Sequence, residues 1–562
     1  MAGSIFGLMG GAALPALTVE VDYNEKTRSF KMRGNPYRIN DLRGIPNRRY
    51  DKRNDVWTAP NTSANVRYFK SNATFTFTEV AQQQLEEAIK PPEKIKLVTW
   101  PWKTKPMAHQ QEALSIALER DYLALLLPTG TGKTKLAIDI ASVRYQRGTI
   151  DRLILLVPAS LQLNWQEEFE THCHVDYTFD RGDGLKIHTF TIEGLGITKS
   201  GFQKALTLCG DRTMIVVDES TKIKNPDAVR TQRAIFISQK CKYRYIMSGT
   251  PITKGPQDLY SQFEFLSPSL FGRSNYVSFR NRYCVMGGYQ NREVIGYDNM
   301  EELLEIVASC SYQVDKKTVL PDLPDKVYTQ RYCKPTNEQV TLFKEIRKNR
   351  ETLTENGIVT AKNVLERMLR LQSVCGGFVN VNTGKNDHRD KPIMVPTPVG
   401  KTNPKINLLM EFLDEFDEPA LIWTPYISEI KAIGAALEKR YGNNNVGYLY
   451  GDVDRDDRQR YVNSLQRGSI KYIVGNPSTG GIGLTMTAAK AAIYFTNSYN
   501  YIDRVQSEDR IHRKGQTEKV LIVDFVMENS VDEVVMMALK AKSDVSDFIR
   551  DNLQLILDNG VI

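Results

Sequence analysis

Two parts of the chain alternate short apolar runs with amphipathic stretches, and this alternation constrains the fold more than any other feature. In the first part, at about residues 121–320, the runs are Tyr122–Leu127, Leu153–Val157 and Met214–Val217. Buried strands of a parallel sheet have this near-continuous apolar character, and helices on the sheet supply the amphipathic stretches. The pattern returns from about Pro404, in Ala420–Trp423, Tyr472–Val474, Ala491–Phe495 and Val520–Phe525. The sequence therefore predicts two α/β lobes in tandem.

The regions outside the lobes have different patterns. Residues Asn337–Cys375 carry apolar side chains near every third or fourth position, which predicts helices. Polar residues with Gly and Pro follow at about Asn380–Asn403 and are interpreted as a linker. We expect an N-terminal α+β or β-rich domain at 1–95, a first lobe at 96–325, a helical insertion and linker at 326–400, and a second lobe at 401–562.

The composition is that of a globular protein with several domains. A chain of 562 residues exceeds the size at which one hydrophobic core keeps growing. Its net charge of +8 is mild for this length and is only weak evidence for a nucleic-acid partner. The seven cysteines include no Cys-x-x-Cys pair, which argues against a zinc ribbon and favours a reducing compartment.

The start of the chain, Met1–Leu17, is small and apolar, but it lacks a positively charged leading segment and is too short to span a bilayer. We interpret it as a flexible or strand-forming end. No later window offers 18 uninterrupted apolar residues, so we expect no membrane attachment. The predicted location is the cytoplasm of a bacterium or archaeon, or of a virus-infected cell of either, and the nucleus if the host is eukaryotic.

A glycine-rich segment, Leu127-Pro-Thr-Gly-Thr-Gly-Lys-Thr134, follows an apolar run directly and precedes the helix-like Lys135–Ala141. This is the context of a phosphate-binding loop, in which backbone N–H groups wrap a phosphate. Lys133 would neutralise the β and γ oxygens of ATP, and the Thr134 hydroxyl would hold Mg²⁺. A glycine-rich turn without function is the weaker interpretation, although Leu127 stands where the usual motif has Gly. The predicted contacts in this loop are Thr129, Gly130, Thr131, Gly132, Lys133 and Thr134.

Two further segments suit the chemistry of hydrolysis. Asp218 and Glu219 end the run Met214–Val217, where Asp218 would bind Mg²⁺ and Glu219 would orient or deprotonate the attacking water. In Gln506–Gln516, Arg510 and Arg513 are three residues apart, share a helical face and would reach a γ-phosphate as arginine fingers. Alone, the first would be an ordinary strand end and the second a solvated basic helix, but together with the phosphate loop they predict an ATPase.

These segments, read with Pro158–Glu168, Asp218–Pro226 and Ser248-Gly-Thr-Pro-Ile252, make the chain similar to the Swi/Snf-type branch of the superfamily-two helicases. The resemblance covers about residues 98–545. It implies two RecA-like lobes and ATP-dependent translocation on duplex DNA without processive strand separation. It also implies DNA as partner, in double-stranded or branched form, and a monomer that meets single-strand-binding, replication or recombination proteins.

The resemblance assigns further residues by their positions in the motifs. Gln110 would lie near the adenine, and Gln506 would act with the two arginines as a sensor between the lobes. Ser248 and Thr250 would couple hydrolysis to DNA contact. A buried structural indole is at least as plausible for Trp165 as a DNA contact. The implied DNA contacts are Trp165, Ser248, Thr250, Gly481, Gly483 and Thr485.

Details of the motifs narrow the branch. The segment Ser248–Pro256 lacks the Asn that chromatin remodellers usually carry, and Thr485 stands where they have Asn. Both features resemble the annealing-helicase and fork-remodelling branch, as does Leu42–Pro60, which is similar to its HARP-type module. In this module Arg48, Arg49 and Trp57 would meet phosphates and bases. The alternative is a small β-rich domain with Trp57 and Tyr50 in its core and solvated arginines.

Other functions remain open at this point. A strand-separating DNA helicase or an RNA helicase of the same superfamily would carry the same motifs. A motor subunit of a restriction or defence system is a second alternative, although no nuclease-like carboxylate cluster stands out in the sequence. A binding protein with an inactive ATP site is least favoured, because every catalytic position is filled.

Overall fold

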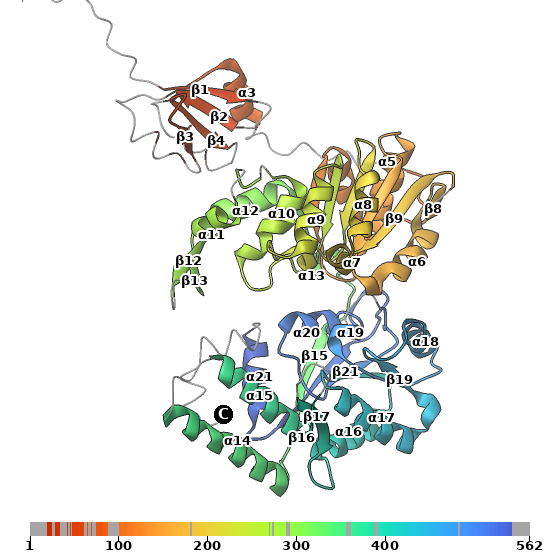
Figure 1. The fold of residues 1–562 in the computed structure, drawn as a ribbon. Helices are drawn as coiled ribbons and strands as arrows, with labels where there is room; N and C mark the ends of the chain where they lie inside the picture. The colour runs from red at the N-terminus through yellow and green to blue at the C-terminus, as the bar shows by residue number, and fades with distance from the viewer. Residues whose placement is uncertain are drawn as a thin grey trace, which may run out of the picture. The chain divides into compact units, whose positions relative to one another are not determined.

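A computed structural model of the chain describes residues 19–24, 29–33, 42, 45, 48–60, 65, 69, 75–87, 100–179, 182–268, 270–272, 275–287, 293–355, 361–386, 392–480 and 484–541. The chain forms two compact units, and each unit contains several separate stretches of the sequence. The last stretch that belongs to the first unit ends at Gln313. One large sheet lies in each unit, and the N-terminal residues form a third, smaller sheet (Figure 1).

The N-terminal sheet has the order β3-β4-β2-β1-β5. Its elements are β1 (Val19–Asn24), β2 (Ser29–Arg33), β3 (Arg49–Asp51), β4 (Val56–Pro60), β5 (Phe75–Phe77) and the helix α3 (Glu79–Glu87). In β1, Val19 and Val21 are buried and alternate with exposed acidic residues, as expected of a sheet with one wet face. Phe30 and Phe69 complete an aromatic core. The expectation of a β-rich N-terminal domain is confirmed.

The first large sheet has the order β14-β6-β11-β10-β7-β9-β8. Its strands are β6 (Tyr122–Leu126), β7 (Arg152–Val157), β8 (Tyr177–Phe179), β9 (Leu185–Thr191), β10 (Thr213–Val217), β11 (Tyr243–Met247) and β14 (Ser311–Gln313). Strands β14, β6, β11, β10 and β7 are parallel neighbours. The predicted apolar runs are therefore strands, and every residue of β10 is buried.

Helices connect these strands. They are α4 (Ala108–Leu118), α5 (Lys133–Gln146), α6 (Gln162–His172), α7 (Ile192–Ile197), α8 (Lys199–Thr207), α9 (Val229–Ser238), α10 (Leu259–Leu266), α11 (Tyr276–Tyr283) and α12 (Met300–Ser309). A hairpin of β12 (Cys284–Gly287) and β13 (Glu293–Tyr297) lies between α11 and α12.

The second large sheet has the order β15-β22-β21-β18-β20-β19, and all of these pairs are parallel. Its strands are β15 (Lys326–Cys333), β18 (Ala420–Trp423), β19 (Val446–Leu449), β20 (Tyr472–Gly475), β21 (Ala491–Tyr494) and β22 (Val520–Met527). The helices here are α13 (Lys316–Val319), α14 (Asn337–Glu355), α15 (Ala361–Cys375), α16 (Pro404–Glu415), α17 (Ile427–Tyr441), α18 (Arg455–Gln466), α19 (Pro477–Gly480), α20 (Tyr501–Glu508) and α21 (Val531–Lys540). Two parallel sheets flanked by helices confirm the predicted α/β class (Figure 1).

The region expected to be helical insertion and linker, 326–400, differs from the prediction at both ends. Strand β15 opens it and pairs with β22, so Lys326–Cys333 belongs to the second sheet. At the other end, β16 (Phe378–Asn386) and β17 (Pro392–Pro398) form an antiparallel hairpin where a linker was expected. Most hairpin side chains are exposed, so cross-strand hydrogen bonds rather than an apolar core define it, and hydropathy gave no signal.

No helix in the described ranges is both long enough and apolar enough to cross a membrane.

Candidate active site

Three predicted motifs start at one edge of the first sheet. Strands β6, β11 and β10 are adjacent and parallel, so their carboxyl ends meet at this edge. The phosphate-loop segment follows β6, Ser248 follows β11 and Asp218 follows β10. The Ser248 N–H donates to the Leu125 carbonyl at 3.3 Å, and the Asp218 N–H donates to that of Leu156 at 2.9 Å. The strand order thus explains why segments that are far apart in the sequence begin at the same edge of the sheet.

The glycine-rich loop has the backbone that its glycines allow. Gly130 and Gly132 have φ angles of +86° and +82°, a region that residues with a side chain rarely adopt. The Thr131 hydroxyl donates to the Pro128 carbonyl at 2.7 Å, and the Lys133 ammonium reaches back to the Leu127 carbonyl at 3.0 Å. Helix α5 begins at Lys133, so the loop leads into a helix N-terminus, where anions are stabilised. Thr129 and Thr134 are partly exposed here.

The acidic pair ends its strand in a strained turn. Asp218 is buried, and its carboxylate accepts the Glu219 N–H at 3.0 Å. Glu219 has φ +52°, an uncommon value for a residue with a side chain, and it is partly exposed. Such outliers gather at functional sites, where the surrounding structure holds them. The turn gives the two neighbouring carboxylates different surroundings, as a metal ligand and a water-orienting group would need.

A residue that sequence reasoning missed joins two of these loops. Gln262 on α10 is fully buried, and its side-chain oxygen accepts the Ser220 hydroxyl at 2.7 Å, two residues after Asp218. Its amide nitrogen donates to the carbonyls of Pro251 and Asp258, each at 2.7 Å. The loop after β10 and the loop after β11 are therefore connected through one amide. No motif marks Gln262, and only its position among the aromatic and leucine residues of α10 could have drawn attention to it.

Asp258 orders the next residues of the loop after β11. Its carboxylate accepts the N–H groups of Thr253 at 2.8 Å and Lys254 at 2.9 Å, and the Thr253 hydroxyl at 2.5 Å. Lys224, from the loop after β10, forms an ion pair with it at 3.5 Å. Ser248 is buried, and its hydroxyl accepts the Thr250 N–H at 3.1 Å. Both predicted coupling residues thus lie in a loop that is tied to the acidic segment.

Gln110 lies near the start of α4 and is buried. Its side-chain oxygen accepts the Met107 N–H at 2.9 Å, which caps the helix. This bond fixes the side chain that the resemblance places near the adenine.

The predicted arginine segment begins in α20, which carries a partly exposed Gln506. Arg510 is buried, its Nη1 lies 3.5 Å from the Leu484 carbonyl, and its own carbonyl accepts the Met486 N–H at 3.0 Å. Arg510 therefore also orders the segment that contains the partly exposed Thr485. Arg513 is partly exposed. Both arginines follow the end of α20 at Glu508, so the expectation that they share a helical face is wrong. Gly481 and Gly483, two predicted DNA contacts, lie outside the described residues.

Two predicted DNA contacts occupy core positions instead. The Trp165 indole is fully buried, with its ring 6.2 Å from that of Phe169. Trp57 belongs to the N-terminal core and lies under Tyr50 at a ring distance of 4.7 Å. A buried indole cannot contact DNA, so the structural alternative holds for both, because large aromatic rings gain most from burial. Tyr50, expected in that same core, is instead 47% exposed.

The arginines of the N-terminal domain are less completely described. Arg48 is exposed and donates to the Ile45 carbonyl at 3.2 Å. The side chain of Arg49 lies outside the described residues, although its backbone belongs to β3. Within the described residues, no group of three or more His, Cys, Asp or Glu side chains is placed to hold a metal ion by itself.

A glycine-rich phosphate loop and an acidic strand end at one edge of a parallel sheet, with a second α/β unit that carries arginines, define the class of P-loop nucleoside triphosphatases. Residues 109–377 match the SNF2-related domain, and residues 404–515 match the helicase conserved C-terminal domain. The chain therefore belongs to the Snf2-type family of superfamily-two helicases and carries the domains of an ATP-hydrolysing helicase or translocase.

Curated relatives share low but extended similarity. The human DNA annealing helicase and endonuclease ZRANB3 is 24% identical over 79% of this chain and 40% of its own length. An uncharacterized ATP-dependent helicase of Mycoplasma genitalium, MG018, is 25% identical over 74% of this chain and 39% of its own. The chain thus spans about two fifths of these two relatives.

A Caenorhabditis elegans homolog of the SWI/SNF-related matrix-associated actin-dependent regulator of chromatin subfamily A-like protein 1 is 26% identical over 90% of this chain and 72% of its own length. Among solved structures, the Sulfolobus solfataricus SWI2/SNF2 ATPase core in complex with dsDNA is 23% identical. It covers 82% of this chain and 97% of its own, with a TM-score of 0.37.

Proposed function

We propose that the protein translocates on double-stranded DNA and remodels or reanneals branched DNA in replication, repair or recombination. The observation that carries this proposal is the similarity to ZRANB3, a protein named as a DNA annealing helicase, over 79% of the chain. The match to the C. elegans protein adds support, because 90% coverage must include part of residues 1–95. Similarity that extends beyond the two matched domains at 109–377 and 404–515 favours a shared substrate as well as a shared motor.

The residues at the edge of the first sheet suit ATP with Mg²⁺. The Thr134 hydroxyl and the Asp218 carboxylate are hard oxygen donors, which Mg²⁺ prefers together with phosphate oxygens and water. When bound, Mg²⁺ would neutralise charge on the phosphates. Lys133 would bind the β and γ oxygens, and Glu219 would orient or deprotonate the attacking water. Gln506, Arg510 and Arg513 would sense the γ-phosphate.

Contact with DNA should pass mainly through phosphates. Such contacts give an affinity that depends on salt and is nearly blind to sequence. In the first unit, Thr250 lies on the loop that Asp258 and Gln262 tie to the acidic segment. In the second unit, Thr485 lies beside Leu484, which Arg510 contacts. Each proposed DNA contact thus lies in a segment that is connected by hydrogen bonds to a segment proposed to act on ATP.

Recognition of a branch point is proposed for the N-terminal domain. Tyr50 is exposed, supported from below by Trp57, and its hydroxyl donates to Asp55 at 2.9 Å. An exposed ring that packs on a second ring can stack on an unpaired base, and Arg48, two residues earlier, can meet a phosphate. We therefore assign the stacking role to Tyr50 rather than to Trp57.

The test is the rate of ATP hydrolysis at fixed low salt under five conditions. These are no nucleic acid, single-stranded DNA, duplex DNA, forked DNA and RNA. We expect forked DNA to stimulate turnover more than duplex DNA, and Tyr50→Ala or removal of residues 1–95 to reduce that preference. Equal stimulation by any duplex would leave a translocase without a fork role. Stimulation by RNA alone, or displacement of a paired strand, would instead identify one of the alternative helicases.

A further inference from the structure

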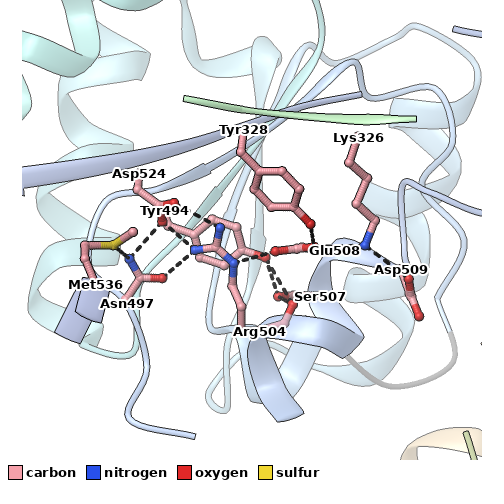
Figure 2. A network of polar contacts seen from close by, with 10 residues as sticks. All are labelled: Lys326, Tyr328, Tyr494, Asn497, Arg504, Ser507, Glu508, Asp509, Asp524 and Met536. Atoms are coloured by element: carbon pink, nitrogen blue, oxygen red, sulfur yellow. Dashed lines mark hydrogen bonds and ion pairs between the residues drawn. The ribbon is translucent and has the colours of Figure 1, made fainter. Parts of the chain in front are cut away.

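A buried arginine lies at the centre of a polar network in the second unit (Figure 2). Arg504 on α20 donates to Asp524 of β22 through both terminal nitrogens, at 2.5 and 3.1 Å. It also donates to Glu508 at 2.6 Å and to Asn497 at 2.6 Å. Its guanidinium carbon lies 3.5 Å from the centre of the Tyr494 ring on β21. One side chain thus fastens α20 to two strands of the sheet.

The geometry of this site requires an arginine. Burial lowers the pKa of Arg504, but Asp524 and Glu508 outweigh it and raise the pKa overall, so the side chain stays charged. Only a planar guanidinium can donate hydrogen bonds to Asp524, Asn497 and Glu508 at once. The same plane also stacks on the Tyr494 ring. A lysine would keep the charge and lose most of these bonds.

The carboxylate of Glu508 extends the network to the edge strand β15. Its second oxygen accepts the Lys326 ammonium at 2.8 Å and the Tyr328 hydroxyl at 2.9 Å, as Figure 2 shows. The next residue, Asp509, accepts Lys316 of α13 at 2.8 Å and Lys326 at 3.4 Å. Three cations and three carboxylates, counting Arg504 and Asp524, therefore balance one another.

A backbone contact continues the network into the arginine segment. The Lys316 ammonium also donates to the His512 carbonyl at 2.8 Å, and the His512 ring nitrogen Nε2 lies 2.6 Å from the Pro324 carbonyl. Residues 316–328 are the first part of the second unit after Gln313, where the chain leaves the first unit. The connecting chain is therefore attached to the residues on both sides of Arg510.

We propose that Arg504, Glu508 and Asp509 are positioning residues for ATP hydrolysis, which fasten the segment carrying Gln506, Arg510 and Arg513 to the second sheet and to the connecting chain at 316–328. The proposal rests on the function proposed above for the two arginines. The segment is held from the sheet through Asp524 and from the connector through Lys316 and Lys326. A displacement of the connector during the ATPase cycle would thus move Arg510 and Arg513 directly.

The sharpest test compares two exposed tyrosines on β15. Tyr328 is 60% and Tyr332 51% exposed, and each hydroxyl makes one side-chain hydrogen bond, to Glu508 and to Gln330 respectively. Tyr328→Phe should lower kcat of the DNA-stimulated ATPase two- to fivefold, with unchanged nucleotide affinity and melting temperature. Tyr332→Phe on the same strand should leave kcat unchanged.

Two further variants give larger effects. Arg504→Lys and Lys326→Gln should lower kcat at least tenfold while KM for ATP changes less than twofold. The control is Arg440→Lys, which removes an exposed bidentate ion pair with Asp414 in the same unit. If Arg504→Lys fails to fold, Tyr328→Phe and Lys326→Gln still decide the question.

The outcomes separate this proposal from the function on which it rests. Unchanged kcat in Tyr328→Phe and Lys326→Gln, while Arg513→Ala is inactive, would overturn the positioning role alone. Full turnover in Arg513→Ala would overturn the arginine function itself. Loss of kcat only in parallel with a loss of melting temperature would identify a merely structural network.

Discussion

The two units hold the segments proposed for catalysis mainly by different chemistry. In the first unit, the loops after β10 and β11 are joined by a neutral amide, Gln262, which bonds to a hydroxyl and two carbonyls, and by a single ion pair between Lys224 and Asp258. In the second unit, the arginine segment is fastened by buried charges around Arg504 and Glu508. Both regions follow parallel strands of a similar sheet, so the fold does not dictate the difference.

The two kinds of connection differ in how much movement they allow. A neutral amide costs little to bury, and its hydrogen bonds can lengthen as a loop adjusts to its ligand. A buried ion-pair network is stable only when every partner is in place, and removing one partner costs about 3–5 kcal/mol. The first arrangement suits loops that move during catalysis, whereas the second suits a segment that must keep one orientation relative to its sheet.

The largest effect should come from the phosphate loop. Lys133→Ala should abolish ATP turnover, by about a thousandfold or more, because no other ammonium in the loop can neutralise the phosphates. DNA binding should remain measurable. Steady-state ATPase and fluorescence anisotropy with labelled duplex would measure the two, and Lys199→Ala, an exposed lysine on α8, is the control. Normal turnover in Lys133→Ala would contradict the ATPase assignment of this loop.

The matching change in the arginine segment is Arg513→Ala. We expect it to bind nucleotide and to hydrolyse it about a thousandfold more slowly, because an arginine finger acts mainly on the charge of the transition state. Single-turnover hydrolysis and binding of a fluorescent ATP analogue separate the two steps. Lys514→Ala, an exposed neighbour, should behave as wild type. Weakened nucleotide binding with an unchanged hydrolysis rate would show that Arg513 holds the ground state instead.

The sequence revealed those parts of the fold whose side chains are buried on both faces. Strands such as β10 and β18 are continuous apolar runs, so their positions followed from hydropathy. Strand β15 lies at a sheet edge and mixes exposed with partly buried residues, and the β16–β17 hairpin is mostly exposed, so neither gave an apolar signal. A strand whose side chains remain exposed is not detected by hydropathy.

The candidate site divides in the same way. Motif residues such as Lys133 and Asp218 were predictable because their spacing after a strand has a chemical meaning. Gln262 and Arg504 act through partners more than fifteen residues away in sequence, Ser220 and Asp524, so only the fold could reveal them. Trp57 and Trp165 were ambiguous because an aromatic ring serves a core as well as a nucleic-acid surface.

A smaller effect should come from the neutral connection in the first unit. Gln262→Leu keeps the volume of the side chain but removes the partners of Ser220 and Pro251, so we expect DNA-stimulated turnover to fall about tenfold and stability by about 1–3 kcal/mol. Basal turnover should fall less. Ser261→Ala is the control, because this buried hydroxyl has no hydrogen-bond partner among the described residues. Equal loss of basal and stimulated turnover would argue against coupling between the two loops.

The smallest effect concerns a buried acid at the carboxyl edge of the second sheet. Burial raises the pKa of Glu429 to about 7, despite the hydrogen bond from Thr424 and the nearby Lys405, whose own ion pair is with Asp532. The fold therefore retains a proton that the unfolded chain releases near its ordinary pKa of 4.5. Stability should fall by roughly 1.4 kcal/mol per pH unit between these values and stay lower above them.

Glu429→Gln tests this by removing the titration while keeping the shape of the neutral acid. Its melting temperature should match wild type near pH 5 and exceed it at pH 8, by an amount that corresponds to at most about 3 kcal/mol. Glu411→Gln, an exposed acid on α16, should show no such dependence on pH. If Glu429→Gln were equally destabilised at both values, the carboxylate would have to be charged in the fold. Glu429 would then belong with Lys405 and Asp532 to a group of buried, mutually balanced charges, like the group around Arg504.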